Sequence, residues 1–341
     1  MFQRCKTQGV IEFGVGAMVK NISTSLNYSD ILGTIKARLG IGRMNYIVLP
    51  GLYSVGNPNS DSPVLVSANY KLTFDELRKN LSGLDCWLLI LDTKGVNVWC
   101  AAGKGTFGTE ELVIRIEAVG LEKIVSHRNL ILPQLGAPGV NSNEVKSRIG
   151  FSVIFGPVRA SDIQAFISSG NKATKEMRLV NFTFTDRLVL TPMELVQATK
   201  MSLPILGSLF VANQFAKKPF DKFDLAAYAG AVFTGSVITP LLLPYIPGKA
   251  FAWKGWIAGV CMTAGLLWKS KRSNLLKAGW LLLFPAISSF LAMNFTGAST
   301  YTSPSGVKKE MQRALPLIVA AAAVGAAVML GIHFFGGRKK Q

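Results

Sequence analysis

One cysteine stands in a setting that could support chemistry. Cys100 lies in the run NVWCAAGKGTFGT (residues 97–109), after a tryptophan and before small residues. No other cysteine is close to it in the sequence, so it belongs to neither a CxxC redox motif nor a zinc site. Amide groups at the start of a helix, together with Lys104, would favour the thiolate form, which binds metals. Cys100 is therefore either a buried structural thiol, the commoner role of a free cysteine, or the single protein ligand of a metal.

The glycines that follow Cys100 allow a second interpretation. Gly103, Gly105 and Gly108 fit the GxGxxG pattern of dinucleotide-binding sites. However, they do not follow the preceding predicted strand directly, and the acidic residue that this fingerprint needs about 20 positions later is absent. A phosphate-binding P-loop also fails, because glycine follows Lys104 where serine or threonine is required.

Strand-like and helix-like stretches alternate through the first half of the chain. Apolar runs predict strands over residues 45–53, 63–70, 86–93, 130–134 and 151–158. Helices are predicted over 73–82, with Thr73 and Glu76 as a capping box, over 110–119, with Thr109 as N-cap, and after Ser161. This alternation predicts an α/β fold with a Rossmann-like, mostly parallel sheet. The Cys100 run follows the most apolar strand, so it should lie beyond a carboxyl end, where such folds bind ligands. Cys86, inside that strand, is expected in the core.

The second half of the chain is too apolar for a soluble domain. After residue 200 its acidic residues are Asp221, Asp224 and Glu310, and lysines and arginines flank long apolar runs. Four runs are long enough to cross a bilayer core of about 30 Å: residues 225–247, 251–268, 278–295 and 315–335. The last run is rich in alanine and glycine and should approach a neighbouring helix closely. Basic residues at span ends explain the net charge of +18 better than nucleic-acid binding does.

A fifth apolar segment, residues 201–216, is short and contains polar residues. If it does not cross, most basic loop residues fall on the same side as the N-terminal half, as the positive-inside rule requires. We therefore predict four firm spans, or five if residues 201–216 also cross. The predicted organisation is an α/β domain over 1–190, a linker with a short amphipathic or membrane segment over 191–222, and a transmembrane helical domain over 223–341. Because no secretory signal is recognisable, the first domain is expected in the cytoplasm of a multi-pass inner-membrane protein.

Three stretches together resemble a known family. NVWCAAGKGTFGT, SPVLVSANYKLTFDELRK (residues 62–79) and PQLGAPGV (residues 133–140) are similar to the membrane-anchored corrinoid proteins of microbial mercury methylation. The resemblance covers most of the chain, because that family also has a hydrophobic tail of several spans. The first half is also similar to the corrinoid-binding domain of the large subunit of corrinoid iron–sulfur proteins, which lack the cysteine of the motif.

The resemblance implies a cobalamin-type corrinoid cofactor, held by a cap helix whose cysteine thiolate is the lower axial ligand of cobalt. That role falls on Cys100. The cap would consist of Asn97, Val98, Trp99, Cys100, Ala101, Ala102, Gly103 and Lys104. Further contacts are expected from Ser67, Asn69 and Thr73 and from Gly136, Ala137, Pro138 and Gly139, each of which could equally be a turn residue. Histidine ligation is not expected, because the DxHxxG motif is absent.

The function that the resemblance implies is corrinoid-dependent methyl transfer to inorganic Hg(II), which gives methylmercury. A methyltetrahydrofolate-dependent system would donate the methyl group. A ferredoxin-like protein with two iron–sulfur clusters would be the reductant, since the chain has no cysteine cluster for an iron–sulfur centre of its own. Two alternatives stay open: a corrinoid methyl carrier of one-carbon metabolism with a non-mercury acceptor, and a membrane-anchored nucleotide-binding or regulatory module.

Overall fold

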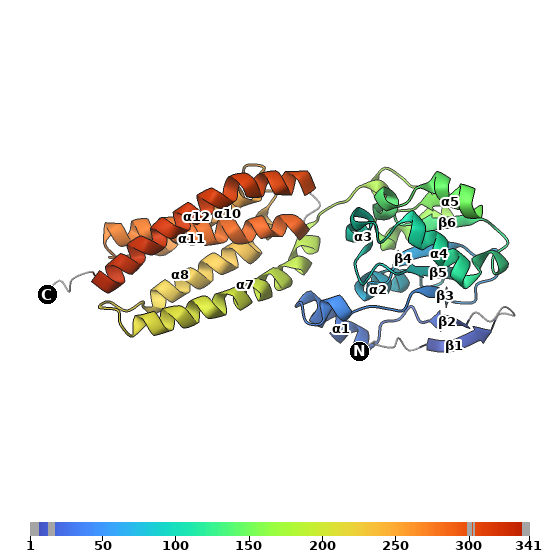
Figure 1. Cartoon of the computed structure of the whole chain (residues 1–341), viewed down its shortest axis with the longest axis horizontal. Helices are drawn as coiled ribbons and strands as arrows, with labels where there is room; N and C mark the ends of the chain where they lie inside the picture. The colour runs from blue at the N-terminus through green and yellow to red at the C-terminus, as the bar shows by residue number, and fades with distance from the viewer. Residues whose placement is uncertain (1–6, 13–17, 299–301, 303, 336–341) are drawn as a thin grey trace. The chain divides into compact units, whose positions relative to one another are not determined.

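The chain divides into two compact units. The computed structural model describes residues 7–12, 18–298, 302 and 304–335 (Figure 1). The first unit comprises Met1–Ala37 and Ile41–Val180, and the second Arg38–Gly40 and Asn181–Gln341. We call them the α/β unit and the helical unit. The predicted fold class is confirmed, because a mostly parallel sheet in the first is followed by helices in the second.

A seven-stranded sheet forms the centre of the described α/β unit, in the order β1-β2-β3-β5-β4-β6-β7. Its strands are β1 (Thr7–Glu12), β2 (Met18–Ile22), β3 (Gly51–Val55), β4 (Val64–Ala68), β5 (Cys86–Leu91), β6 (Asn129–Leu132) and β7 (Ser152–Phe155). β5, β4, β6 and β7 are mutually parallel, and Ser67 lies opposite Ile90 in the β4–β5 register. β3 pairs antiparallel with β5, β2 parallel with β3, and β1 antiparallel with β2.

Helices cover both faces of the sheet. The helices of this unit are α1 (Tyr28–Arg38), α2 (Lys71–Lys79), α3 (Val98–Lys104), α4 (Thr109–Val119), α5 (Ser142–Ile149) and α6 (Ile163–Ser168). Five short 3₁₀ helices also occur in its described part: η1 (Arg43–Asn45), η2 (Leu121–Lys123), η3 (Gln134–Gly139), η4 (Ala160–Asp162) and η5 (Glu176–Arg178). Leu89 packs with α3, α4 and α5, whereas its neighbour Leu88 packs with α2 and α6. Every residue of β5 is buried, which explains its continuous apolar run.

The sequence located four of the parallel strands. β4, β5, β6 and β7 lie within, or within one residue of, the predicted runs. The predicted strand over 45–53 is largely wrong, because β3 begins only at Gly51. The residues before it form η1 and then a single bridge between Ile47 and Tyr70. Val48 donates its backbone N–H to the carbonyl of Asn69, so this apolar segment packs beside the end of β4.

Two predicted helix caps are wrong. α2 begins at Lys71, and its N-cap makes no side-chain hydrogen bond, so Thr73 lies inside the helix. α4 is capped by Gly108. The Thr109 hydroxyl instead accepts a hydrogen bond from the backbone N–H of Asn141, at 2.8 Å. This bond ties the start of α4 to the segment between η3 and α5.

The helical unit contains α7 (Phe184–Asn213), α8 (Lys222–Phe233), α9 (Thr239–Leu242), α10 (Phe251–Leu267), α11 (Asn274–Asn294) and α12 (Pro304–Phe335). A π-helical turn, η6 (Thr234–Ile238), connects α8 to α9, and η7 (Phe295–Ala298) follows α11. Four helices in the described residues are long and apolar enough to cross a membrane: Phe184–Asn213, Lys222–Leu242, Asn274–Gly297 and Ser305–Phe335.

Three of these four helices coincide with the predicted spans over 225–247, 278–295 and 315–335, and the fourth, α7, takes the place of the predicted span over 251–268. Residues 201–213 are the second half of α7, a continuous 30-residue helix that also occupies much of the predicted linker. The predicted span over 251–268 is the 17-residue helix α10, which is shorter than the other four. If α7 crosses, Lys217 and Lys218 lie across the membrane from its first residues. The charge argument for the side of the α/β unit reverses only if α10 crosses as well; if α10 does not cross, Lys269, Lys271 and Arg272 stay on the side of the α/β unit.

The expected close approach of the last helix is confirmed. A Cβ placed on Gly325 of α12 would lie 2.7 Å from the backbone nitrogen of Leu283 and 2.8 Å from the carbonyl oxygen of Gly279. Only a glycine therefore allows this contact between α11 and α12.

A polar cluster that the sequence did not bring together joins three helices at one end of the helical unit. Arg272 pairs with Asp221, at 2.6 Å, and with the buried Asp224, at 3.0 Å. His333 of α12 stacks on Phe220, with ring centroids 3.9 Å apart. The cluster ties the start of α8 to the loop before α11 and to the end of α12.

Candidate functional site

The loops that leave one edge of the sheet bring the predicted site residues together. β4 leads into Asn69 and α2, β5 into the loop before α3, and β6 into η3. Because these three strands are parallel, their carboxyl ends lie at the same edge. Residues 97–109 therefore lie where folds of this kind bind ligands.

α3 has an inner and an outer face. Its inner residues are buried in the core: Val98, Ala101 and Ala102. Its outer residues are exposed or partly exposed: Trp99, Cys100, Gly103 and Lys104. This division follows the helical period of 3.6 residues. The Cys100 side chain therefore lies at the surface side of the helix, which does not fit a buried structural thiol.

Both ends of α3 are fixed. The Asn97 side chain accepts a hydrogen bond from the backbone N–H of Cys100, at 2.9 Å, and so caps the first turn. Gly105 ends the helix in the left-handed conformation, with φ of 80°. The backbone that carries the thiol is therefore held in place from both sides.

η3 packs directly against α3. A Cβ placed on Gly139 would overlap the carbonyl oxygen of Phe107 and lie 3.0 Å from the Cα of Ala102. A Cβ on Gly136 would lie 2.5 Å from the Phe107 ring. Both glycines are therefore required by internal packing, and we expect them to position α3 instead of touching a ligand.

Gly103 has the opposite environment. No atom lies within 4 Å of a Cβ placed there. Gly103 is three residues after Cys100, so the two share the outer face of α3. The absent side chain leaves room for a large flat ligand to come close to the helix backbone.

These environments predict opposite effects of the same substitution. Gly139→Ala should lower the free energy of unfolding of the α/β unit by about 1–3 kcal/mol, because the added methyl group overpacks the α3–η3 contact. Gly103→Ala should leave it unchanged or raise it by up to about 1 kcal/mol, because alanine is the better helix former. Thermal melting of the full chain in detergent measures both. Equal destabilisation by the two variants would contradict the assignment of inner and outer faces.

Asn69 organises the loop between β5 and α3. Its Oδ1 accepts hydrogen bonds from the backbone N–H groups of Thr93, at 3.1 Å, and Gly95, at 3.0 Å, and from the Thr93 hydroxyl, at 2.9 Å. Its Nδ2 donates to Asp92, at 3.1 Å. These bonds occupy the amide, so Asn69 positions the loop that leads to Cys100. The sequence motifs did not identify the residues that position this loop, which are Asn69, Thr93 and Gly95.

The other predicted contact residues are spread along the same edge. Ser67 is buried within β4, and Thr73 is half-buried on α2. Ala137 is half-buried and Pro138 exposed in η3. The structure thus brings α3 and η3 into contact, whereas Ser67 faces the protein interior.

The GxGxxG pattern does not have the geometry of a dinucleotide site. Gly103 lies inside α3, Gly105 ends that helix and Gly108 caps α4. A Cβ on Gly108 would lie 2.8 Å from the carbonyl oxygen of Gly105. Gly105 and Gly108 therefore shape the corner between two helices and Gly103 lies on the outer face of α3, whereas the fingerprint requires a strand that ends at the first glycine.

The remaining cysteines and acidic residues do not assemble a metal cage. Within residues 7–12, 18–298, 302 and 304–335, no three His, Cys, Asp or Glu side chains are grouped so that they could hold an ion. Cys86 lies in the core, as predicted, and burial raises the pKa of its thiol to about 12. Cys261 is exposed on α10, and Cys5 lies outside the described residues.

Comparison with known proteins gives one consistent similarity. The family model described as "CO dehydrogenase/acetyl-CoA synthase delta subunit" matches residues 23–167, which lie in the α/β unit. The acetyl-CoA decarbonylase/synthase complex subunit gamma of Methanopyrus kandleri is 35% identical over 122 residues, or 35% of this chain and 26% of that protein. The subunit gamma of Methanocaldococcus jannaschii is 33% identical over 139 residues, or 40% and 28%. The subunit gamma of Archaeoglobus fulgidus is 29% identical over 151 residues, or 43% and 32%.

The similarity covers only part of this chain and only part of each relative. The matched part of the chain spans about a quarter to a third of the length of these curated relatives. The family model covers less than half of this chain. Residues 23–167 include α3, η3 and the loops at the carboxyl edge of the sheet.

Proposed function

We propose that the α/β unit binds a corrinoid over the outer face of α3, with Cys100 as the lower axial ligand of its cobalt. The observation that carries this proposal is a partly exposed thiol in the first turn of α3, beside the open space over Gly103. A corrinoid would bring its cobalt already held by the macrocycle, so one protein ligand, the Cys100 thiolate, would suffice. A single cysteine without a surrounding metal cage fits that requirement.

The residues around Cys100 would act by holding and exposing the thiol. Bound corrinoid supplies a cobalt that can carry a methyl group from a donor to an acceptor. Asn97 fixes the backbone of Cys100, and Lys104 adds a positive charge at the end of the same short helix. Trp99, which is 36% exposed, offers an aromatic surface beside the thiol. Gly103 keeps the approach to the helix open.

The reaction we propose is methyl transfer in one-carbon metabolism, with Hg(II) as the methyl acceptor and methylmercury as the product. The similarity of residues 23–167 to the CO dehydrogenase/acetyl-CoA synthase delta subunit supports the one-carbon part. The resemblance of NVWCAAGKGTFGT to the mercury-methylation family supports the acceptor. A methyltetrahydrofolate-dependent donor and a two-cluster ferredoxin-like reductant complete the proposal. Because a reactive thiolate needs a reducing compartment, we place the α/β unit on the cytoplasmic side of the inner membrane.

A second candidate is a methyl carrier with a non-mercury acceptor. The curated relatives are subunits of acetyl-CoA decarbonylase/synthase complexes, which favours it. Assays of the loaded full chain with Hg(II), and separately with thiols and metalloids, distinguish the two candidates.

The test is to purify the full chain without oxygen and to measure bound corrinoid by its visible spectrum and cobalt content. We expect one corrinoid per chain and methylmercury when donor, reductant and Hg(II) are supplied. Gly103→Ala should fold normally and bind corrinoid more weakly, because its methyl group enters the open space. A bound dinucleotide in place of corrinoid would overturn the proposal.

A further inference from the structure

Large apolar side chains gather on residues 28–37 and 41–49 of the α/β unit, which together we call the 28–49 surface. Its members and their exposed fractions are Tyr28 (80%), Ile31 (49%), Leu32 (37%), Ile35 (50%), Ile41 (58%), Met44 (69%) and Leu49 (50%). In the rest of the described α/β unit, only Trp99, Ile114, Leu179 and Val180 are comparably exposed. Such a concentration of apolar area on one short segment indicates a binding surface.

Helix α1 forms half of this surface and exposes its apolar face, whereas it buries its acidic residue. Tyr28, Ile31, Leu32 and Ile35 follow the i, i+3, i+4, i+7 spacing of one helix face, and that face is exposed. The residues that α1 buries are Asp30, Gly33 and Ala37. A helix of a soluble domain normally buries its apolar face and exposes its charges.

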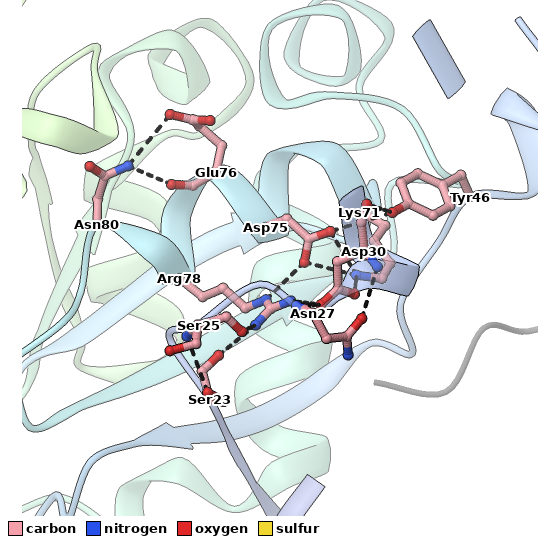
Figure 2. Close-up of polar contacts among 10 residues, drawn as sticks. All are labelled: Ser23, Ser25, Asn27, Asp30, Tyr46, Lys71, Asp75, Glu76, Arg78 and Asn80. Atoms are coloured by element: carbon pink, nitrogen blue, oxygen red, sulfur yellow. Dashed lines mark hydrogen bonds and ion pairs between the residues drawn. The ribbon is translucent and has the colours of Figure 1, made fainter. Parts of the chain in front are cut away.

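A buried ion-pair network holds α1 in this orientation. Figure 2 shows Lys71 and Arg78 of α2 between the carboxylates of Asp30 and Asp75. Lys71 pairs with Asp30 at 2.7 Å and with Asp75 at 2.6 Å. Arg78 pairs with the same two carboxylates at 2.6 Å and 2.8 Å. All four side chains are buried, so rotating α1 would remove Asp30 from both of its partners.

Contacts of the next segment add to this constraint. The Tyr46 hydroxyl donates to the backbone carbonyl of Asp30, at 3.2 Å. A Cβ on Gly33 would lie 2.5 Å from that hydroxyl, so α1 packs closely on Tyr46. The outward apolar face is therefore a fixed property of the fold.

The charges around the 28–49 surface identify the kind of partner. Asp30 is the one acidic residue between positions 28 and 49, and it is paired internally. The basic residues of the segment are Lys36, Arg38 and Arg43, and Lys36 is exposed. An apolar helix face with a tyrosine and a basic border is typical of a helix that lies in the headgroup region of an anionic bilayer.

The chain itself keeps a bilayer within reach. Only residues 181–183 separate the α/β unit from α7, whose last charged residue is Lys200. Three extended residues and the helical residues 184–200 together span no more than about 40 Å. A surface tethered this closely meets the membrane at a high effective concentration.

We propose that the 28–49 surface rests on the anionic headgroup region of the membrane in which the chain is anchored. Tyr28, Ile31 and Ile35 would enter the interface, and Lys36 would pair with lipid phosphates. This inference does not depend on the identity of the cofactor. The same segment of the chain also contacts the loops beside Cys100. The Ile47 side chain would be 2.6 Å from a Cβ on Gly95, and the backbone carbonyl of Tyr46 accepts a hydrogen bond from the backbone N–H of Lys71. The surface thus adjoins loops at the carboxyl edge of the sheet.

Photo-crosslinking in vesicles tests this proposal. The full chain is reconstituted into phosphatidylcholine vesicles with and without phosphatidylglycerol, with p-benzoylphenylalanine in place of Ile31. The matched control carries it in place of Ile114, which is similarly exposed on α4. We expect several-fold more lipid adduct from position 31, detected by mass spectrometry, and an increase when phosphatidylglycerol is present.

A charge variant provides the second arm. Lys36→Glu, combined with the probe at position 31, should reduce the phosphatidylglycerol-dependent adduct without changing the melting temperature, because Lys36 is exposed. Equal lipid adducts at positions 31 and 114 would overturn the proposal. So would adducts from position 31 predominantly to protein, which would indicate a second copy or the helical unit as the occupant.

Discussion

Replacing Cys100 with alanine is expected to abolish methyl transfer and to leave the protein folded. The side chain lies on the outer face of α3, outside the packed core, and alanine favours a helix more than cysteine does. Loss of the thiolate should change the visible spectrum of bound corrinoid, because the axial ligand sets the electronic state of the metal. We expect methyl transfer to fall at least about 100-fold, since removing even an indirect partner of a metal ligand costs about 10–100-fold.

Comparison of Cys100→Ala with two further cysteine variants tests whether the loss of activity comes from the Cys100 thiolate itself. Cys261→Ala is the matched control, because Cys261 is exposed on α10, in the other unit of the chain. It should leave both the spectrum and the activity unchanged. Cys100→His should retain partial activity, because imidazole also ligates cobalt. An unchanged spectrum and full activity in Cys100→Ala would remove Cys100 from the cobalt.

The central sheet could be predicted because its sequence signal is local. β5 is six consecutive buried apolar residues, a pattern that a strand covered on both faces produces directly. Residues 45–50 look similar in sequence, yet they pack along the end of β4 through Val48 and Ile47. Periodicity cannot separate these two cases, because the difference lies in which distant backbone groups the segment meets.

The long helix α7 was missed for a different reason. The apolar stretch over 201–216 is short and contains Pro204, Asn213 and Gln214, which led to the prediction of a linker with a short amphipathic or membrane segment. The structure has one helix over Phe184–Asn213, with Pro192 and Pro204 inside it. Proline is unfavourable inside a helix, so local propensity argued against a continuous element here.

The sequence predicted which residues form the candidate site, but it did not predict which residues hold them in place. The sequence placed the Cys100 run at the carboxyl edge of the sheet, and the family resemblance implied a helix there, which the structure has as α3. Asn69 and Gly139 were predicted as cofactor contacts, but their hydrogen bonds and close packing join them to residues about 24 to 37 positions away. Such long-range partners leave no spacing signal, so a contact residue and a positioning residue look the same in one sequence.

The buried ion pairs could not be predicted from the sequence either, because the residues that pair are far apart along the chain. Asp30 and Lys71 are 41 positions apart, and charged residues on helices are usually solvated. Their meeting decides which face of α1 is exposed, and therefore creates the apolar surface over residues 28–49. A local rule for amphipathic helices fails here because a distant pair of charges overrides it.

Lys71→Met is expected to destabilise the α/β unit by about 3–5 kcal/mol, because it leaves the carboxylates of Asp30 and Asp75 buried with Arg78 as their one remaining cation in the network. Lys79→Met is the matched control on the same helix. Lys79 pairs with Glu76 at the surface, with side chains 44% and 55% exposed, so its loss should change stability by no more than about 0.5 kcal/mol. Thermal melting of the full chain in detergent compares the two, and equal effects would show that the buried network contributes little.

The pH dependence of the same variant tests the cause. Burial by itself raises the pKa of Asp30, but hydrogen bonds from Lys71, Asn27 and Arg78 outweigh it and hold the pKa below its ordinary value of 3.8. A carboxyl group whose pKa is lowered by folding stabilises the protein above its unfolded pKa, and this contribution is lost as the pH falls through the folded value. Without Lys71 the folded pKa of Asp30 should rise toward or above its unfolded value, so Lys71→Met should lose less stability than the wild type as the pH falls from neutral to acidic values. Combining Lys71→Met with Asp30→Asn leaves Asp75 paired with Arg78 and should recover part of the loss, whereas strictly additive losses would indicate that Lys71 and Asp30 do not interact.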